Sequence, residues 1–450
     1  MSSVQAGVNA TNSVAKGVNK VTPKFAKTGL NAVGNLGEKG IKMVTNNKYA
    51  RFLGDKSNEL IGKVREGVAK TFNAGLVNTV DEIKSFGDLA KTDSITQVMI
   101  VIIFLLFLMI FVWSVNKLGL NKKNCANIDE VYSKFPLISS ISENNDNFKN
   151  FKLRDYYIKT AYNCCSSGKY KNDFVNLCAL RSCIRQGARC LDFEIYSVDN
   201  QPVIAASSNL DFNVKETYNT ILFSRAMETV ANYAFSGSNC PNPKDPLILH
   251  FRIMTSSTKI HDEIAKQLYD TLSEKLLGKN FSYENNGKNI GSYPLLRLKE
   301  KVIIMVDKAN PIFVSTLLNE YVNITSNSAF VRELRFSEVK FTHDPDDLKH
   351  YNKQNMSIVL PDISPNNKNY SHRLASVYGC QMIGLSFQNF DNYMKDYTQH
   401  FDTAGYAFIL KPENLRYVPV FIPKPSDQDE KLSYAEKPFV VNDDLAQLKM

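Results

Sequence analysis

The sequence has few of the residues and motifs that most often mark catalytic or metal-binding sites. Its 450 residues include six histidines and one tryptophan. No two of its eight cysteines form a Cys-x-x-Cys pair, which argues against a structural zinc site. The sequence also has no P-loop, no Gly-x-Gly-x-x-Gly motif and no internal repeat. These absences argue against a nucleotide-binding enzyme, a zinc module and a repeat protein.

The composition is typical of a globular protein, with 44% hydrophobic and 22% charged residues. The net charge of +9 is concentrated at the N-terminal end, where residues 1–97 contain 14 Lys and Arg against 8 Asp and Glu. A basic segment of this size suits an anionic membrane surface or an acidic protein partner, and it is equally compatible with a solvated arm that binds nothing. We expect no nucleic-acid partner.

One apolar run stands out, at residues 98–115. It contains one serine and no charged residue, and Trp113 lies near its end, where an interfacial aromatic residue is expected. We predict a single transmembrane helix over residues 94–116. The alternative is a buried core helix, but helices of soluble proteins rarely stay apolar on every side.

The orientation of this helix stays open. More lysines follow the run than precede it, which favours a cytosolic C-terminal domain (Lys117, Lys122, Lys123 and Lys134 against Lys84 and Lys91). The long arm without a signal peptide and four Asn-x-Ser/Thr triplets favour a lumenal one (Asn280, Asn323, Asn355 and Asn369).

The remaining chain divides by composition. Residues 1–93 read as a basic arm, mobile or partly helical, whose apolar stripe over residues 56–86 either packs on a protein or lies on the membrane. We expect a linker at 117–148, a domain at 149–419 that can be separated near Asn147, and a charged tail at 420–450. Strand-like and helix-like segments alternate from residue 190 to 306, which indicates βαβ units and a parallel sheet, whereas residues 309–354 read as a partly irregular connection.

Two blocks of this domain resemble eukaryotic phosphatidylinositol-specific phospholipase C. LRDYYIKTAYNCC (153–165) and CLDFEIYSV (190–198) resemble the family's X box, over residues 149–308. GCQMIGLSFQN (379–389) and GYAFILKPENLR (405–416) resemble its Y box, over residues 355–419. The resemblance implies a (β/α)8 barrel of the TIM type, with chemistry at the carboxyl ends of the strands.

The resemblance also assigns a Ca²⁺ site, and the sequence departs from it. Asn163, Asp192 and Glu194 fall on three of the family's calcium ligands, but the fourth, a glutamate, falls on Arg252. Calcium requires six to eight oxygen ligands, and a guanidinium beside the site opposes it. We expect Arg252 to pair with Asp192 or Glu194 and to occupy the space of the metal.

The catalytic positions of the family are altered as well. Its two histidines fall on Tyr162 and Ala206, and neither side chain can shuttle protons at neutral pH. The phosphate-contacting lysines fall on Met305 and Asp307, and a Y-box arginine on Ile358. His250 lies two residues before Arg252 and shares its strand face, so these two residues are candidates for substrate contact, although a lone histidine at this depth is more often a core residue.

These features favour a membrane-anchored phospholipase C-like protein that has lost catalysis and acts in binding or scaffolding. Its expected ligands are membrane lipid, including a phosphoinositide headgroup, and a protein partner bound through the arm. The first alternative is an active phosphoinositide phosphodiesterase that uses altered groups, and the second is a structural membrane protein.

Overall fold

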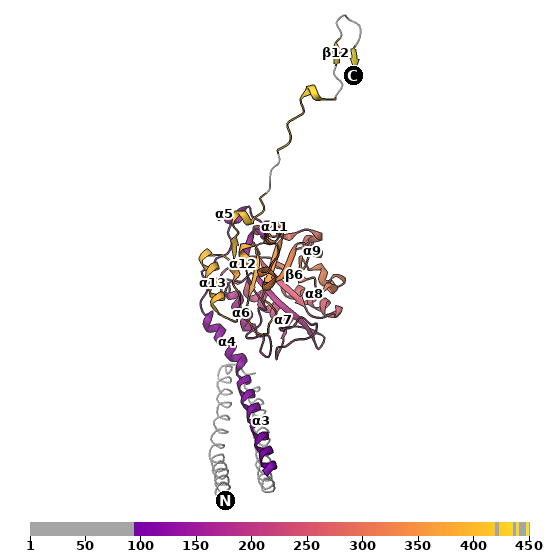
Figure 1. Ribbon diagram of the computed structural model, residues 1–450. Helices are drawn as coiled ribbons and strands as arrows, with labels where there is room; N and C mark the ends of the chain where they lie inside the picture. Colours follow the sequence, from indigo (N-terminus) through magenta and orange to yellow (C-terminus); the bar gives the residue numbers. More distant parts are fainter. Residues whose placement is uncertain (1–93, 419–422, 435–437, 441–446, 450) are drawn as a thin grey trace, which may run out of the picture. The chain divides into compact units, whose positions relative to one another are not determined.

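The computed structural model describes residues 94–418, 423–434, 438–440 and 447–449. The predictions for residues 1–93 lie outside these ranges. The chain divides into two units, Met1–Val112 and Trp113–Met450, and the second contains the whole barrel (Figure 1).

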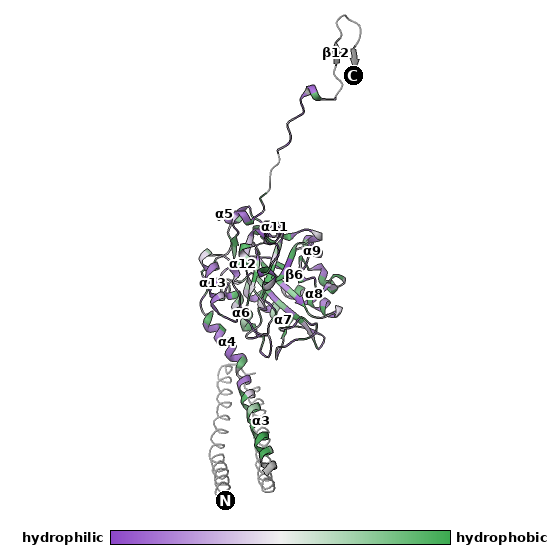
Figure 2. Cartoon of the chain, in the orientation of Figure 1, coloured by the Kyte–Doolittle hydropathy of each residue, from purple (hydrophilic) through white to green (hydrophobic). Residues whose placement is uncertain are grey.

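The apolar run lies in helix α3 (Ser94–Leu118). Figure 2 shows much of this helix as hydrophobic, and its large apolar side chains from Val98 to Val115 are exposed, except for the half-buried Ile100. By length and composition, α3 is a candidate for crossing a membrane.

Eight parallel strands form a nearly closed barrel in the order β7-β6-β5-β2-β1-β10-β9-β8. Among the described residues, no ladder joins β7 to β8. The strands are β1 (Tyr156–Ala161), β2 (Cys190–Val198), β5 (Leu247–Ile253), β6 (Val302–Asp307), β7 (Ile324–Ser326), β8 (Val331–Arg335), β9 (Met356–Leu360) and β10 (Met382–Leu385). The predicted (β/α)8 fold is confirmed.

Helices follow the strands and cover the barrel (Figure 1). The main ones are α6 (Leu177–Arg185), α7 (Phe223–Ala234), α8 (Thr258–Leu272), α10 (Phe336–Lys340), α11 (Pro345–Gln354), α12 (His372–Val377) and α13 (Asn392–Ala404). The chain ends α13 at Gly405, whose φ of +75° places it in the left-handed region that glycine adopts without strain.

Three short strands add antiparallel edges. β3 (Gln201–Ala205) pairs with β2 and with β4 (Ile221–Leu222), and β11 (Phe408–Leu410) pairs with the start of β1. In the predicted tail, β12 (Pro438–Val440) pairs antiparallel with β13 (Gln447–Lys449) in a separate two-stranded sheet.

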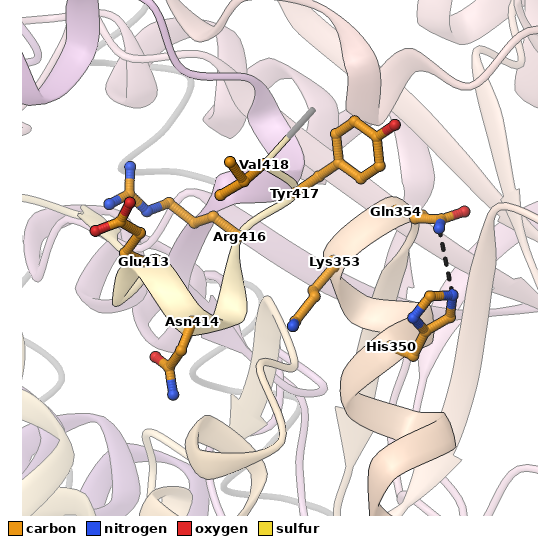
Figure 3. A pocket seen from close by; sticks show the side chains of 8 residues that line it. All are labelled: His350, Lys353, Gln354, Glu413, Asn414, Arg416, Tyr417 and Val418. Carbon is orange, nitrogen blue, oxygen red and sulfur yellow. Dashed lines mark hydrogen bonds between the residues drawn. The ribbon is translucent and has the colours of Figure 1, made fainter. Parts of the chain in front are cut away.

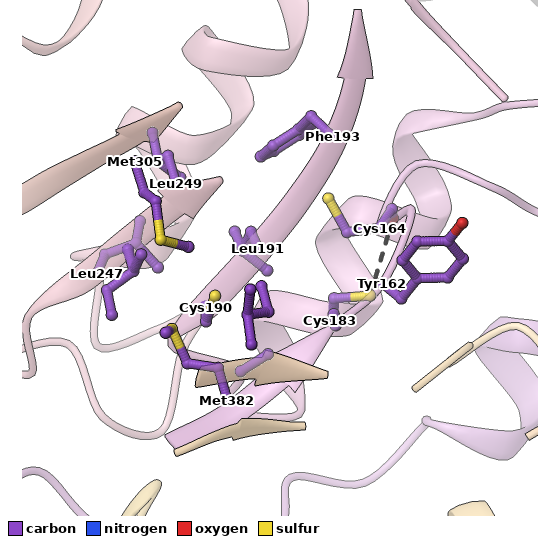
Figure 4. Packing of buried hydrophobic residues seen from close by; sticks show 14 of the residues in the cluster. Tyr162, Cys164, Cys183, Cys190, Leu191, Phe193, Leu247, Leu249, Met305 and Met382 are labelled. Atoms are coloured by element: carbon purple, nitrogen blue, oxygen red, sulfur yellow. Dashed lines mark hydrogen bonds between the residues drawn. The ribbon is translucent and has the colours of Figure 1, made fainter. Parts of the chain in front are cut away.

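The strands bury side chains on both faces, which is typical of a parallel barrel sheet. All seven residues of β5 and the first seven of β2 are buried. Figure 4 shows part of this core, where Leu191, Phe193, Leu249 and Met305 lie among buried cysteines. Cys183 and Cys190 are free and buried, as expected of small core side chains.

Two segments differ from their sequence description. The connection at 309–354 supplies two barrel strands, β7 and β8, together with α10 and α11. Its strands are three and five residues long, and β8 is only half-buried, so their apolar pattern is weak. The polar composition of this segment therefore gave no sequence signal for β7 and β8.

The predicted linker at 117–148 also packs on the barrel unit. It contains α4 (Leu120–Val131) and α5 (Asp146–Lys149), and it buries Ile128, Tyr132 and Ile141. The Cys125–Cys178 disulfide links α4 to α6. Only a few apolar residues spaced along a polar segment make these contacts, so composition suggested a connector.

Candidate functional site

The candidate site is built from side chains that β2 and β5 direct into the barrel. Asp192 and Glu194 are two residues apart on β2, so they share one strand face. Parallel pairing sets Asp192 beside His250 and Glu194 beside Arg252. All four side chains are buried, with at most 3% of each residue exposed. The register of two strands therefore brings four predicted site residues together.

Arg252 is enclosed by oxygen atoms. Its Nε donates to Oδ1 of Asp192 at 3.0 Å, and its Nη2 donates to Oδ2 of Asp192 at 3.0 Å. The same Nη2 lies 2.9 Å from Oδ1 of Asn163 and 3.4 Å from Oε2 of Glu194. The pair with Asp192 is the bidentate fork that a guanidinium forms with a carboxylate. The pairing expected for Arg252 is present with both acidic residues.

Asn163 connects the end of β1 to this cluster. Its backbone N–H donates to Oδ2 of Asp192 at 3.0 Å, and its Nδ2 donates to Oε2 of Glu194 at 3.2 Å. Its φ of +42° lies in the left-handed region, which asparagine tolerates better than most residues. Residue type and backbone shape thus favour the same role, which is to hold both carboxylates from one side.

His250 extends the cluster across the barrel. Its Nδ1 lies 2.8 Å from Oδ1 of Asp192, and its Nε2 lies 2.9 Å from Oγ of Ser326 on β7. Ser326 donates in turn to Oε2 of Glu333 on β8 at 3.0 Å. Sequence reasoning missed Ser326 and Glu333, since both lie in the segment read as a connection. His250 is a satisfied buried residue that also belongs to the site.

Aromatic side chains complete the enclosure. The Tyr196 hydroxyl donates to Oε1 of Glu194. The ring of Tyr162 lies 5.0 Å from the Arg252 guanidinium carbon, a distance that allows a cation–π contact. Tyr170 packs edge-on against Tyr162. One sequence signal could have found Tyr196. It lies two residues after Glu194 on the same strand, so the two side chains share one strand face.

The electrostatics follow from burial and from the single guanidinium. Burial alone would raise the pKa of Asp192, but the charge of Arg252 and the hydrogen bonds of His250 and Arg252 outweigh it and hold that pKa well below its usual range. Burial dominates for Glu194, whose pKa is raised despite Arg252, and for Glu333, whose pKa is also raised. Asp192 is therefore the carboxylate that Arg252 neutralises.

This arrangement does not fit Ca²⁺. Both carboxylates and the Asn163 amide oxygen, which would be the ligands, already accept from the guanidinium. Among the residues that the structure describes, no group of three or more His, Cys, Asp or Glu side chains could hold a metal ion. A divalent ion at the same place would face a positive charge within contact distance. The cluster is complete without a metal.

The positions of the two family histidines lie in the core without replacement groups. Tyr162 is buried, and burial raises the pKa of its hydroxyl further above neutrality. Ala206 is fully buried, and its carbonyl accepts from the N–H of Glu216 at 3.0 Å. Neither can exchange a proton with a substrate at neutral pH.

The phosphate-contact positions are equally changed. Met305 and Ile358 are fully buried in the hydrophobic core. Asp307 ends β6 and accepts from the Asn327 side chain and the Ala309 N–H. These three positions therefore offer no cation to a phosphate.

A concave surface lies elsewhere on the barrel. Figure 3 shows its lining, with a volume of about 580 Å³, between the end of α11 and the residues after η7 (Glu413–Leu415). Gln354 precedes β9, so this pocket lies toward the amino ends of the strands, away from Asp192 and Arg252. It contains none of the predicted site residues.

Comparisons with known proteins relate part of this chain to a family. Residues 150–308 match the family model for the X domain of phosphatidylinositol-specific phospholipase C. The chain is similar in structure to PLC21 from L. pealei and to PLC21 from S. officinalis, each at 19% identity and a TM-score of 0.50, over 60% of this chain and 39% of the other. It is also matched to a calcium-dependent phosphoinositol-specific phospholipase C from Pseudomonas sp., at 10% identity and a TM-score of 0.39, over 61% of this chain and 98% of the other.

The likeness to the two PLC21 structures supports the fold, and the chain spans about two fifths of their length. A search of curated protein sequences found no match.

Proposed function

Residues 150–308 of this chain form an X domain of the phosphatidylinositol-specific phospholipase C family, and from this we propose a membrane-anchored barrel that has lost the family's catalysis and serves in binding or scaffolding at a membrane. Its ligand class is membrane lipid, with a phosphoinositide headgroup as the family's characteristic target. A protein partner bound through the basic arm is part of the same proposal.

The observation that carries the proposal is the enclosure of Arg252. A catalytic barrel of this family needs a metal and two proton-transfer groups beside the phosphate. Here a protein cation contacts Asp192, Glu194 and Asn163, and the cluster is almost wholly buried. General acid and base groups each contribute about 10²- to 10⁴-fold to rate, so a site without them and without a metal should turn over too slowly to measure.

Anchoring is supported by α3 and by the charge of the arm. The helix is long, apolar and exposed, and most of the net positive charge of the protein precedes it. A cationic segment beside an apolar helix gains attraction from anionic lipids. An anchor of this kind would keep the barrel at the membrane without any turnover.

The test is a hydrolysis assay on the full chain inserted in vesicles that contain labelled phosphatidylinositol lipids, with and without calcium. We expect no release of soluble inositol phosphate above the protein-free blank, while an active phospholipase C added to the same vesicles releases it. The control variant Asp192→Asn should match wild type, because no metal depends on that carboxylate.

One observation favours the alternative of an active phosphodiesterase. His250 lies between Asp192 and Ser326, with Glu333 beyond, which is an arrangement that can orient an acid–base imidazole. Calcium-dependent release that disappears in Asp192→Asn or His250→Gln would establish this alternative and reject the proposal.

A further inference from the structure

The Cys125–Cys178 disulfide carries information about the compartment of the barrel. Cys125 lies on α4, seven residues after the end of α3, and Cys178 lies on α6. Their Cα atoms are 5.8 Å apart, within the range that a disulfide requires. The cytosol keeps such thiols reduced, and oxidising compartments keep them paired. A bridge so close to the membrane helix therefore reports which side the barrel faces.

Neighbouring contacts hold the two helices together around this bridge. The side chain of Asn124 donates to Asp173 at 2.8 Å, and that of Asn176 donates to Asn121 at 3.1 Å. The other six cysteines are free and buried in the barrel unit. Burial raises the pKa of several of these thiols, such as Cys190 and Cys183, and so keeps them unreactive. The chain thus pairs the half-buried Cys125 with the buried Cys178 and keeps the other six thiols buried.

The glycosylation triplets of the barrel unit give an independent observation. Three of their four asparagines have side chains that hydrogen-bond within the fold: Asn323 accepts from the Ile304 N–H at 2.8 Å, Asn369 donates to the Asn389 carbonyl at 2.8 Å, and Asn355 accepts from Asn289 at 3.1 Å. The fourth, Asn280, is exposed on η2 (Lys279–Phe281), and its hydrogen bond with Asn286 uses the backbone carbonyl. Only at Asn280 does the fold leave room for a sugar among these four.

We propose that the barrel faces the oxidising, extracytoplasmic side of the membrane and that Asn280 is an N-glycosylation site. The orientation rests on the membrane anchor of the proposed function, and it would separate the barrel from the anionic phosphatidylinositol lipids of the cytoplasmic leaflet, which leaves other membrane lipids or a protein as its ligand. The lysines that follow α3 favour the opposite side by number. That bias steers short loops, whereas large domains translocate largely regardless of charge. A disulfide, by contrast, requires an oxidising compartment, so it favours the extracytoplasmic orientation over the cytosolic one.

The modification is a group transfer from an oligosaccharide carried on a lipid diphosphate. Nδ2 of Asn280 forms a bond to the anomeric carbon of the sugar, the bond from that carbon to the diphosphate oxygen breaks, and the lipid diphosphate leaves as the amide loses one proton. Ser282 completes the Asn-Phe-Ser triplet and is buried in the folded chain. Transfer must therefore precede folding of this segment, as the chain enters the compartment. A sugar attached at that stage to Asn323, Asn355 or Asn369 would have to displace the hydrogen bonds described above, whereas one on Asn280 would not.

The test expresses the full chain in a cell that performs N-glycosylation and follows its mobility before and after endoglycosidase treatment. We expect one enzyme-sensitive shift, lost in Asn280→Gln and in Ser282→Ala and kept in Ser282→Thr. Under denaturing, non-reducing conditions six of the eight cysteines should react with a maleimide, and eight after reduction.

The arm contains a control triplet, Asn9-Ala-Thr, on the other side of α3 in sequence. A shift that survives Asn280→Gln and is lost in Asn9→Gln would overturn the proposed orientation, as would a membrane-bound chain with no shift and eight reactive thiols. Release of the chain by alkaline carbonate would instead reject the membrane anchor itself, so the two failures are distinguishable.

Discussion

At the scale of single residues, Arg252 is at the centre of the polar cluster inside the barrel. It is a buried cation that contacts two carboxylates and an amide oxygen. Buried ion pairs often contribute little net stability, because desolvation offsets the attraction between the charges. Removal of one partner is nevertheless costly, since the other charge stays buried and unpaired. The cluster should therefore act as a unit, because each charged member compensates the burial of the others.

We predict that Arg252→Met destabilises the protein by about 3–5 kcal/mol, since it leaves Asp192 charged and buried. Combining it with Asp192→Asn and Glu194→Gln should recover part of the loss. Chemical denaturation of the barrel unit measures the effect. The matched control is Arg225→Met, which removes an exposed pair with Glu228 and should cost less than about 1 kcal/mol. Equal losses in the two single variants would show that the buried network is not coupled.

Lys159 on β1 is a second buried cation of the barrel. It is fully buried on β1, its Nζ has no hydrogen-bond partner among the described residues, and it lies 5.7 Å from the Phe401 ring centroid. Burial lowers its pKa to about 8, although Asp402 opposes the shift. The folded pKa is below the unfolded one, so the unfolded chain binds more protons between about pH 8 and 10.5, and stability should rise with pH across that window.

We predict that Lys159→Met stabilises the barrel at pH 7 by about 1–3 kcal/mol and flattens the rise in stability between pH 8 and 10. Lys411, with a pKa lowered by burial to about 7, should retain its own share of the rise in stability with pH, which begins lower, near pH 7. Thermal melts across this range test both points, with the exposed Lys266→Met as the control. A less stable variant with an unchanged pH profile would contradict the assignment.

At the scale of elements, α4 follows the apolar helix α3 and packs on the barrel. Ile128, Tyr132, Ile138 and Ile141 follow one another along this segment and are each at most 5% exposed. Burial of one such side chain contributes roughly 1.5–3 kcal/mol. The burial of four such side chains therefore contributes a free energy comparable to the net free energy of unfolding of a typical domain, roughly 5–15 kcal/mol. These contacts lie before the boundary that the sequence predicts near Asn147.

We therefore predict different behaviour for two truncated chains without α3. A chain that begins at Asn116 should be soluble without detergent and melt cooperatively. A chain that begins at Asn147 should aggregate or melt far lower, because it exposes the surface that α4 and residues 132–141 cover and loses the Cys125–Cys178 bridge. Size-exclusion chromatography and calorimetry compare them. Equal melting temperatures would return the boundary to Asn147.

The elements also explain which parts of the barrel could be foreseen. β2 and β5 are long and almost wholly buried, and they lie in specific motifs, so the pairing of Arg252 with the two carboxylates followed from strand alternation and the family resemblance. β7 and β8 are short and polar, and their inward residues Ser326 and Glu333 carry no local signal. Tyr196 could have been predicted from the alternation of side chains along β2, which places it on the face of Glu194. The Cys125–Cys178 pairing depends on the docking of α4, which no spacing of cysteines encodes.

At the scale of the whole molecule, the parts combine into a barrel with family architecture and an altered interior. Residues 150–308 match the X domain of the family, whereas Asn163, Asp192 and Glu194, which the resemblance assigns to a metal, accept hydrogen bonds from the Arg252 guanidinium. The apolar helix α3 precedes this barrel and supplies the proposed anchor. Retention at a membrane without turnover is the function that we propose for this combination.

The claim that Arg252 holds the place of the metal is tested most directly by thermal melting of wild type and Arg252→Glu, with and without millimolar calcium. The variant sets three carboxylates beside Asn163, so without calcium it should melt lower than wild type, because like charges crowd the site. With calcium it should rise, since a ligand that binds only the folded state stabilises it, whereas wild type should not respond. An equal rise in wild type would show that calcium binds despite Arg252, and the proposed loss of the metal site would be wrong.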